Sequence, residues 1–155
     1  MSEATTRPAG ARVLGVDLGT RRIGLALSDT TRTIATPFTV IGRGRSTADD
    51  HAVIRRIAID EGAGIVVVGM PLSLSGRSGP AARAASAEID ALARVLAGVA
   101  EVLAHDERLT TVSAERALQS ARLTKRRQRE LVDKVAAAVM LQSFLDADAA
   151  GRLVL

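Results

Sequence analysis

Acidic residues at three places in the sequence have settings suited to phosphodiester chemistry. Asp17 ends an apolar run and is followed by a glycine turn, in the segment GVDLGTRRIGLALSD at residues 15–29. Asp106 and Glu107 follow a second apolar run, and Asp133 lies in the segment VDKVAAAVMLQ. Because a buried carboxylate is costly unless a cation compensates it, these acids are candidate metal ligands.

Any metal in this chain must be held by oxygen atoms. The sequence has no cysteine, and its only histidines are His51 and His105. Two divalent ions bound by carboxylates can activate an attacking water and stabilise the leaving oxygen of a phosphodiester. On this scheme Asp17 bridges the ions, Glu107 and Asp133 hold one each, and Asp106 is a substitute for Glu107. We therefore predict catalysis by Asp17, Glu107 and Asp133 with Mg²⁺ or Mn²⁺ as cofactor.

The acids at the first two places also have purely structural interpretations. Aspartate and glycine are common at hairpin turns, which accounts for Gly19 better than for Asp17. Asp106 and Glu107 suit the end of a strand that leads into a helix capped by a threonine. The sequence leaves both interpretations open.

Asp133 lies on the apolar side of its segment. At helical spacing it shares a face with Ala136, Ala137, Met140 and Phe144, so its carboxylate is expected to point toward the sheet. A surface charge would not occupy that face. An arginine could satisfy a carboxylate buried there as well as a metal could.

The elements that position these acids alternate in a recognisable order. Residues 33–41 are predicted to form an edge or bulged strand because Pro37 lies inside them. Residues 65–70 form a continuous apolar run, typical of a parallel strand buried on both faces. The full set is strands at 13–17, 23–28, 33–41, 65–70 and 99–104, and helices at 48–61, 81–96, 111–121 and 130–148. This order predicts an α/β fold with a mixed five-stranded sheet, an antiparallel meander of three strands plus parallel strands, flanked by helices.

Length and composition indicate one globular domain. The chain has 155 residues, 47% of them apolar. We expect a flexible tail at 1–11, one nuclease domain at 12–148 and a second tail at 149–155. No apolar run reaches the roughly 20 residues that span a bilayer, and the first ten residues do not resemble a signal peptide. A cytoplasmic location without membrane association is expected.

Positive charge favours a polyanionic partner. The net charge is +4, and Lys125 and Lys134 are the only lysines among 21 basic residues. The planar guanidinium group of arginine presents a fork of N–H donors that matches the geometry of a phosphate group. A basic connector at 122–129 is predicted to precede the last helix, with a solvated loop as its alternative role. Phe38 and Phe144 are both expected in the core, so base stacking is not expected to dominate binding. The predicted nucleic-acid-binding residues are Arg21, Arg22, Arg108, Arg122, Lys125, Arg126, Arg127 and Arg129.

Four motifs in register resemble the YqgF/RuvX family. They are GVDLGTRRIGLALSD, VVVGMPLSLSGRSGP, DERLTT and VDKVAAAVMLQ, and the resemblance extends from Arg12 to Leu145. It implies an RNase H-like fold related to the RuvC resolvases, with the acidic site at Asp17, Glu107 and Asp133. It also implies a nuclease that matures the 5′ end of pre-16S ribosomal RNA, in ribosome biogenesis. The loop at Ser73 to Ser78 departs from the family pattern, so its role is not assigned.

Three other functions compete with this one. A Holliday junction resolvase would cut four-way DNA junctions, and symmetric cutting would need a homodimer, whereas an RNA processor could act as a monomer. A binding module without catalysis would use the same fold. The Asp-x-Gly-Thr turn is also similar to the phosphate-binding turn of actin-like ATPases and sugar kinases, which need two such lobes. The sequence does not decide between RNA and DNA.

Overall fold

The computed structural model describes residues 10–70, 79–106 and 125–149. Its centre is a five-stranded sheet in the order β3-β2-β1-β4-β5. The strands are β1 (Arg12–Leu18), β2 (Arg22–Ser28), β3 (Ala35–Gly42), β4 (Ala63–Met70) and β5 (Glu101–Asp106). The first three pair antiparallel, and β4 pairs parallel with both β1 and β5. The predicted mixed sheet is therefore confirmed.

Two features of the strands follow directly from their sequences. β4 lies between two parallel neighbours, and its residues Ile65 to Val68 are fully buried, as the continuous apolar run predicts. β3 is an edge strand whose pairing register shifts where Pro37 meets Ala26. Proline cannot donate to a sheet ladder, which explains both its edge position and the bulge.

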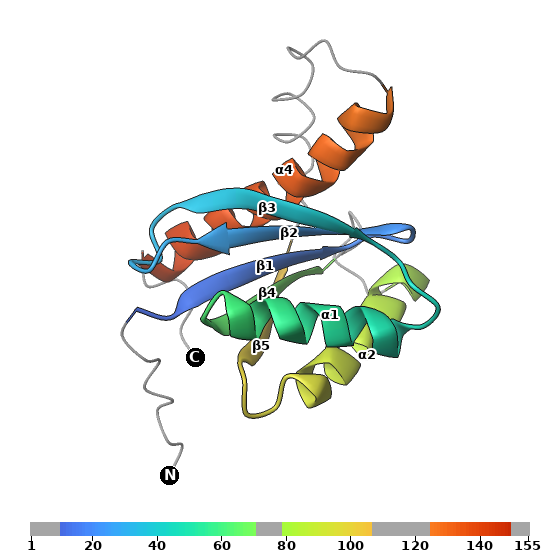
Figure 1. The fold of residues 1–155 in the computed structure, drawn as a ribbon, viewed down its shortest axis with the longest axis horizontal. Helices are drawn as coiled ribbons and strands as arrows, with labels where there is room; N and C mark the ends of the chain where they lie inside the picture. The colour runs from blue at the N-terminus through green and yellow to red at the C-terminus, as the bar shows by residue number, and fades with distance from the viewer. Residues whose placement is uncertain (1–9, 71–78, 107–124, 150–155) are drawn as a thin grey trace.

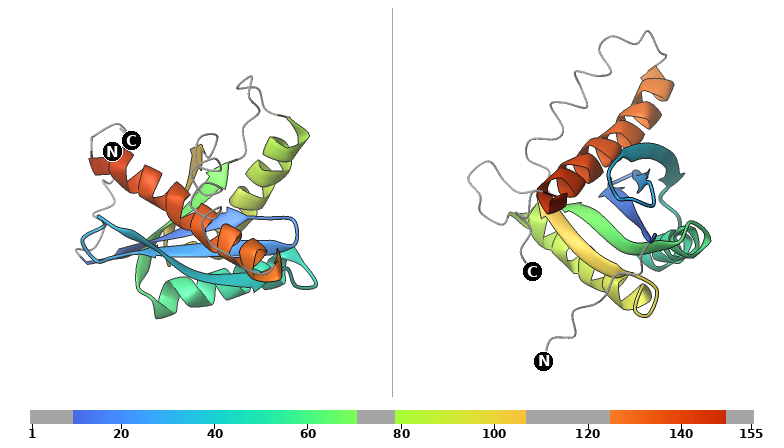
Figure 2. Two further views of the ribbon diagram at one scale, coloured as in Figure 1. Left: turned by 90° about the horizontal axis from the view of Figure 1, so that it is seen from above. Right: turned by 90° about the vertical axis from the view of Figure 1, so that its left-hand side faces the viewer.

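Helices cover both faces of the sheet (Figure 1). Helices α1 (Thr47–Asp60) and α2 (Pro80–Val95) pack on one face, against a core that includes Leu14, Leu25 and Val66. Helix α4 (Lys125–Ala149) packs on the other face, against Val13, Ala26 and Val67. Figure 2 shows the first turns of α4 extending past the edge of the sheet. Among the described residues, no helix is long and apolar enough to cross a membrane.

Three expectations differ from the structure. Helix α4 begins at Lys125 rather than at residue 130, because its first turn is rich in lysine, arginine and glutamine, which favour helix without an apolar stripe. Phe38 is not a core residue: it is 38% exposed at the β3 bulge, whereas Phe144 is buried. β5 extends to Asp106, which the sequence placed just beyond the strand. The helix predicted at 111–121 and the loop at 73–78 lie outside the described residues.

Candidate active site

Asp17 lies near the carboxyl end of β1, on the face of the sheet that α4 covers. Side chains alternate along a strand, so Asp17 shares a face with Val13, which packs against α4. Its partner on β2 is Gly24, directly across the antiparallel pair. Because Gly24 has no side chain, helix α4 can occupy the space beside Asp17.

Two glycines bring α4 very close to the sheet at this point. A Cβ atom on Gly15 would lie 2.9 Å from Leu141 Cβ, and one on Gly24 would lie 2.1 Å from the Asp133 carbonyl oxygen. Real side chains do not fit at these distances, so the helix packs at this depth because both positions are glycine. As a result of this close packing, Asp133 lies next to β1 and β2, the pair of strands to which Asp17 belongs.

The two carboxylates interact electrostatically. Burial and, to a smaller extent, the nearby negative charge of Asp133 together raise the pKa of Asp17 from 3.8 to about 6. Asp133 in turn accepts a hydrogen bond of 2.6 Å from Arg22 Nε. The site thus holds two acids and one paired arginine, an arrangement in which a further cation beside Asp17 is favourable.

Asp106 and Asp17 project from opposite faces of the sheet. Along β5, Leu103 packs with the α4 core and Val102 with the core of α1 and α2. Alternation places Asp106 with Val102, away from Asp17. Glu107, the other residue of the predicted pair, lies outside the described residues.

Within residues 10–70, 79–106 and 125–149, three metal-binding side chains do not gather at one point. Asp17 and Asp133 supply two carboxylates, which is the hard oxygen chemistry that Mg²⁺ and Mn²⁺ prefer. The raised pKa of Asp17 is the property expected of a largely buried acid whose charge needs a cation. The residues present therefore fit a divalent metal, with room in the ligand set for one more acid.

The predicted nucleic-acid-binding arginines have different environments. Arg22 pairs with Asp133 and so belongs to the acidic site. Arg21, in the turn after β1, is exposed, as are Arg127 and Arg129 near the start of α4. The backbone of Lys125 and Arg126 is helical, whereas Arg108 and Arg122 lie outside the described residues.

A polar cluster on the opposite face was not predicted from the sequence. It joins Arg43, which follows β3, to Asp50 and His51 on α1 and to Glu88 on α2. On α1, Asp50 and His51 are buried together with Ile54 and Ala58. The only sequence signal was an acid and a histidine placed beside Ile54 and Ala58 on the apolar side.

A cavity of about 310 Å³ lies at the far end of α4 from Asp133. Its walls come from the turn between β2 and β3 and from the last residues of α4, including Arg32 and Asp146. It contains none of the predicted site residues. The paired carboxylates, rather than this cavity, mark the candidate active site.

Solved structures identify the class of fold. Two structures of Thermus thermophilus RuvC superpose on 90% of this chain and 96% of theirs, one of them in complex with a Holliday junction substrate. Their TM-scores are 0.58 and 0.53, at 15% and 14% sequence identity. The chain therefore has an RNase H-like fold.

The family follows from sequence comparison. The RuvX family, described as Holliday junction resolvase, matches residues 11–147, and the chain belongs to this family. A relative from Acidiphilium cryptum is 43% identical and aligns over 92% of this chain and 89% of its own length. Another, from Gluconacetobacter diazotrophicus, is 45% identical over 89% of this chain and 88% of its own. Both carry the name "Putative pre-16S rRNA nuclease".

Proposed function

We propose that this chain is a metal-dependent endonuclease that hydrolyses phosphodiester bonds in structured nucleic acid, with precursor 16S ribosomal RNA as its substrate. The observation that carries the proposal is that Asp133 lies close enough to Asp17 for its charge to raise the pKa of Asp17. A largely buried acid near a strand end, with its pKa raised by burial and by a second acid, is a common setting of a catalytic site.

Asp17, Asp133 and Glu107 would hold the divalent metal. We assign the third ligand to Glu107 rather than to Asp106, because Asp106 lies on the other face of the sheet from Asp17. Bound Mg²⁺ or Mn²⁺ supplies charge that stabilises the pentavalent phosphate and assists the attack of water. Arg22 Nε donates a 2.6 Å hydrogen bond to one oxygen of Asp133 and so fixes the orientation of this carboxylate.

Exposed arginines beside this site are suited to the phosphate backbone. Arg21 follows Asp17 in the turn to β2, and Arg129 lies one helical turn before Asp133 on α4. Arg127 is exposed on the same end of the helix, which extends past the sheet (Figure 2). Arginines in this arrangement would hold a folded polyanion by phosphate contacts and shape, with little dependence on base sequence.

The names of the relatives support ribosomal precursor RNA as the substrate. A resolvase is the second candidate, supported by the family description and by the fold of RuvC. Symmetric cutting of a junction requires two sites related by a two-fold axis, hence a homodimer. An RNA processor that acts on one strand requires only a monomer. RNA processing of this kind would be carried out in the cytoplasm.

A direct comparison of substrates tests the proposal. The purified protein is offered a precursor 16S ribosomal RNA, a pre-ribosomal particle and a mobile DNA junction at equal salt and metal concentrations. Cleavage near the 5′ end of the mature RNA is expected. Symmetric cutting of the junction with intact RNA would favour the resolvase, and tight binding without cleavage of any substrate would favour a binding module.

A further inference from the structure

The turn between β1 and β2 joins two residues of the acidic site. Asp17 precedes it, and Arg22, the partner of Asp133, follows it. The turn is tight: the Gly19 amide donates to the Asp17 carbonyl at 3.1 Å, and a Cβ on Gly19 would lie 2.3 Å from the Arg22 carbonyl oxygen. Any change in the turn therefore moves Asp17 and Arg22 relative to each other.

A single residue, Arg43, binds two carbonyl groups of this turn. Arg43 Nε donates to the Gly19 carbonyl oxygen at 2.9 Å, and the Arg43 backbone amide donates to the Arg21 carbonyl oxygen at 2.9 Å. Arg43 comes immediately after β3, whose last residue Gly42 pairs with Arg22. The turn is thus fastened from outside the β1–β2 hairpin at two points.

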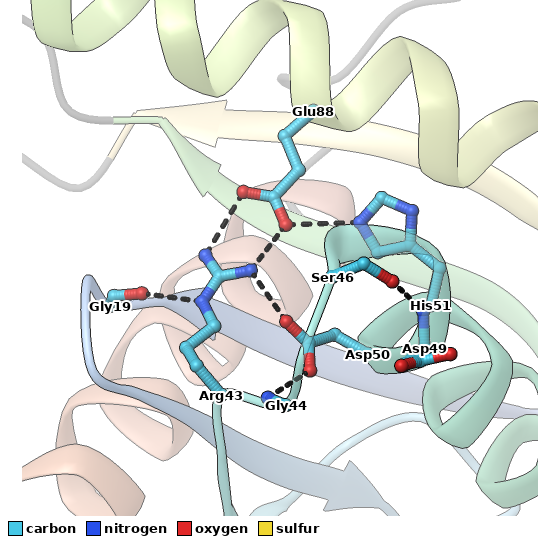
Figure 3. Close-up of polar contacts among 8 residues, drawn as sticks. All are labelled: Gly19, Arg43, Gly44, Ser46, Asp49, Asp50, His51 and Glu88. Atoms are coloured by element: carbon cyan, nitrogen blue, oxygen red, sulfur yellow. Dashed lines mark hydrogen bonds and ion pairs between the residues drawn. The ribbon is translucent and has the colours of Figure 1, made fainter.

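The remaining N–H groups of Arg43 are fixed by carboxylates from two helices (Figure 3). Its Nη1 and Nη2 donate to the two oxygens of Glu88 on α2, at 2.6 and 3.0 Å. Nη1 also donates to Asp50 on α1 at 3.3 Å. A planar guanidinium bound on this many sides has one allowed orientation, so Glu88 and Asp50 determine where its Nε points.

The carboxylates are themselves held in place. His51 Nε2 lies 3.0 Å from Glu88 Oε2, and the Gly44 amide donates to Asp50 Oδ1 at 2.7 Å (Figure 3). Asp50 and His51 are 4% and 1% exposed. Burial alone would raise the pKa of Glu88, but the hydrogen bonds from Arg43 and His51 lower it, so Glu88 stays ionised at neutral pH.

We propose that Arg43 is a positioning residue for the acidic site: it fixes the β1–β2 turn and thereby the relative positions of Asp17 and Arg22. This proposal rests on the proposed nuclease function. A cluster that served only to join α1 to α2 would need no hydrogen bond to the turn, yet Arg43 Nε donates one to the Gly19 carbonyl oxygen. Through Glu88, the placement of α2 acts on the geometry of a site on the opposite face of the sheet.

Arg43→Lys provides the main test, because lysine keeps the positive charge but cannot bind Gly19 and both oxygens of Glu88 at once. We expect kcat to fall by about tenfold to a hundredfold, with KM for the nucleic acid changed less than about twofold, as for a misplaced catalytic group. Arg12→Lys is the matched control, since Arg12 pairs with Glu61 at 3.2 Å at the other end of β1. Its kcat should equal that of the parent.

Amide hydrogen exchange gives a second measure that is independent of activity. In Arg43→Lys the Gly19 amide should exchange at least tenfold faster than in the parent, whereas amides of β4 such as Val67 should change little. A loss of global stability would instead accelerate all of these amides together. Glu88→Gln, which keeps the Nε–H of Arg43 but weakens the contact that orients it, should give a smaller effect of the same sign and serves if Arg43→Lys does not fold.

The outcomes separate the two proposals. An active parent together with an Arg43→Lys variant of unchanged kcat, or of unchanged Gly19 exchange, overturns the positioning role and leaves the nuclease function intact. A parent that cleaves no nucleic acid with Mg²⁺ or Mn²⁺ overturns the nuclease function and the catalytic role of Arg43 with it. Faster Gly19 exchange with reduced kcat supports both.

Discussion

The carbonyl group of Asp133 lies directly over Gly24, where a Cβ atom on residue 24 would come within 2.1 Å of the carbonyl oxygen. Gly24 is also the cross-strand partner of Asp17. One glycine therefore sets the distance between the strand that carries one acid and the helix that carries the other. The site depends on this packing as much as on its charged groups.

Replacing Gly24 with alanine tests this dependence without removing any functional group. The contacted atom belongs to the α4 backbone, which cannot move aside as a side chain would, so the helix must shift. We expect a loss of about 1–3 kcal/mol in the free energy of unfolding and at least a tenfold loss of nuclease activity. Gly42→Ala on β3 is the control, because a Cβ there meets no atom within 4 Å. Chemical denaturation and cleavage rates measure both effects, and equal behaviour of the two variants would refute the packing role.

The stability of the metal-free protein should depend on the charge of Asp17. Its pKa is raised to about 6 in the folded protein, so the folded state holds the proton more tightly than the unfolded state does. The resulting penalty grows as the pH rises from about 4 to 6 and stays constant above that range. Asp17→Asn should therefore stabilise the metal-free protein at neutral pH, by at most about 3 kcal/mol.

Thermal unfolding at pH 4 and pH 7.5 measures this effect. The variant should gain stability at pH 7.5 and show almost no difference at pH 4. Asp60→Asn, at an exposed acid on α1, provides the control for loss of one negative charge. A variant at Asp17 that is less stable than the parent at both pH values would contradict the burial of an uncompensated charge.

Metal binding should follow the ionisation of Asp17. A metal must displace the proton from this carboxyl group, so the apparent affinity for Mn²⁺ should fall about tenfold per pH unit below about pH 6. Above that pH it should level off. Titrations of Mn²⁺ at several pH values between 5 and 8 provide the measurement. An affinity that is constant over this range would exclude Asp17 as a ligand.

Salt dependence tests the basic end of α4. Arg127 and Arg129 are exposed there, and neutralising both should lower the slope of log affinity against log salt by roughly two, if each contacts one phosphate. Binding should weaken equally for unrelated sequences. Neutralising Arg55 and Arg56, exposed on the opposite face of the sheet, should leave the slope unchanged. A slope that responds equally to both pairs would place the contacts elsewhere.

Local patterns in the sequence predicted much of the fold. The sequence predicts Asp17 as a candidate ligand because it follows a buried apolar run, and it predicts the orientation of Asp133 because this residue shares a helical face with Ala137 and Met140, both of which are buried. The bulge at Pro37 followed from the chemistry of proline alone. These features depend on residues that are close together in the chain.

The features that the sequence did not predict depend on distant residues or on weak local signals. Arg43 and Glu88 are 45 positions apart and meet only after α1 and α2 pack on the sheet. The start of α4 was missed because charged residues without an apolar stripe resemble a loop. The sequence offers Asp106 as an alternative to Glu107, whereas the alternation of side chains along β5 puts Asp106 on the other face of the sheet from Asp17.

The central claim is that Asp17 and Asp133 form a metal-dependent nuclease site, and the rate of metal-dependent cleavage in Asp17→Asn tests it most directly. The parent and the variant, each purified free of other nucleases, are compared on precursor 16S ribosomal RNA over a range of Mg²⁺ and Mn²⁺ concentrations. Asparagine preserves the size of the side chain but removes the charged ligand, so cleavage should fall by about a thousandfold or more while RNA binding persists. A variant that cleaves as fast as the parent at every metal concentration would contradict the claim.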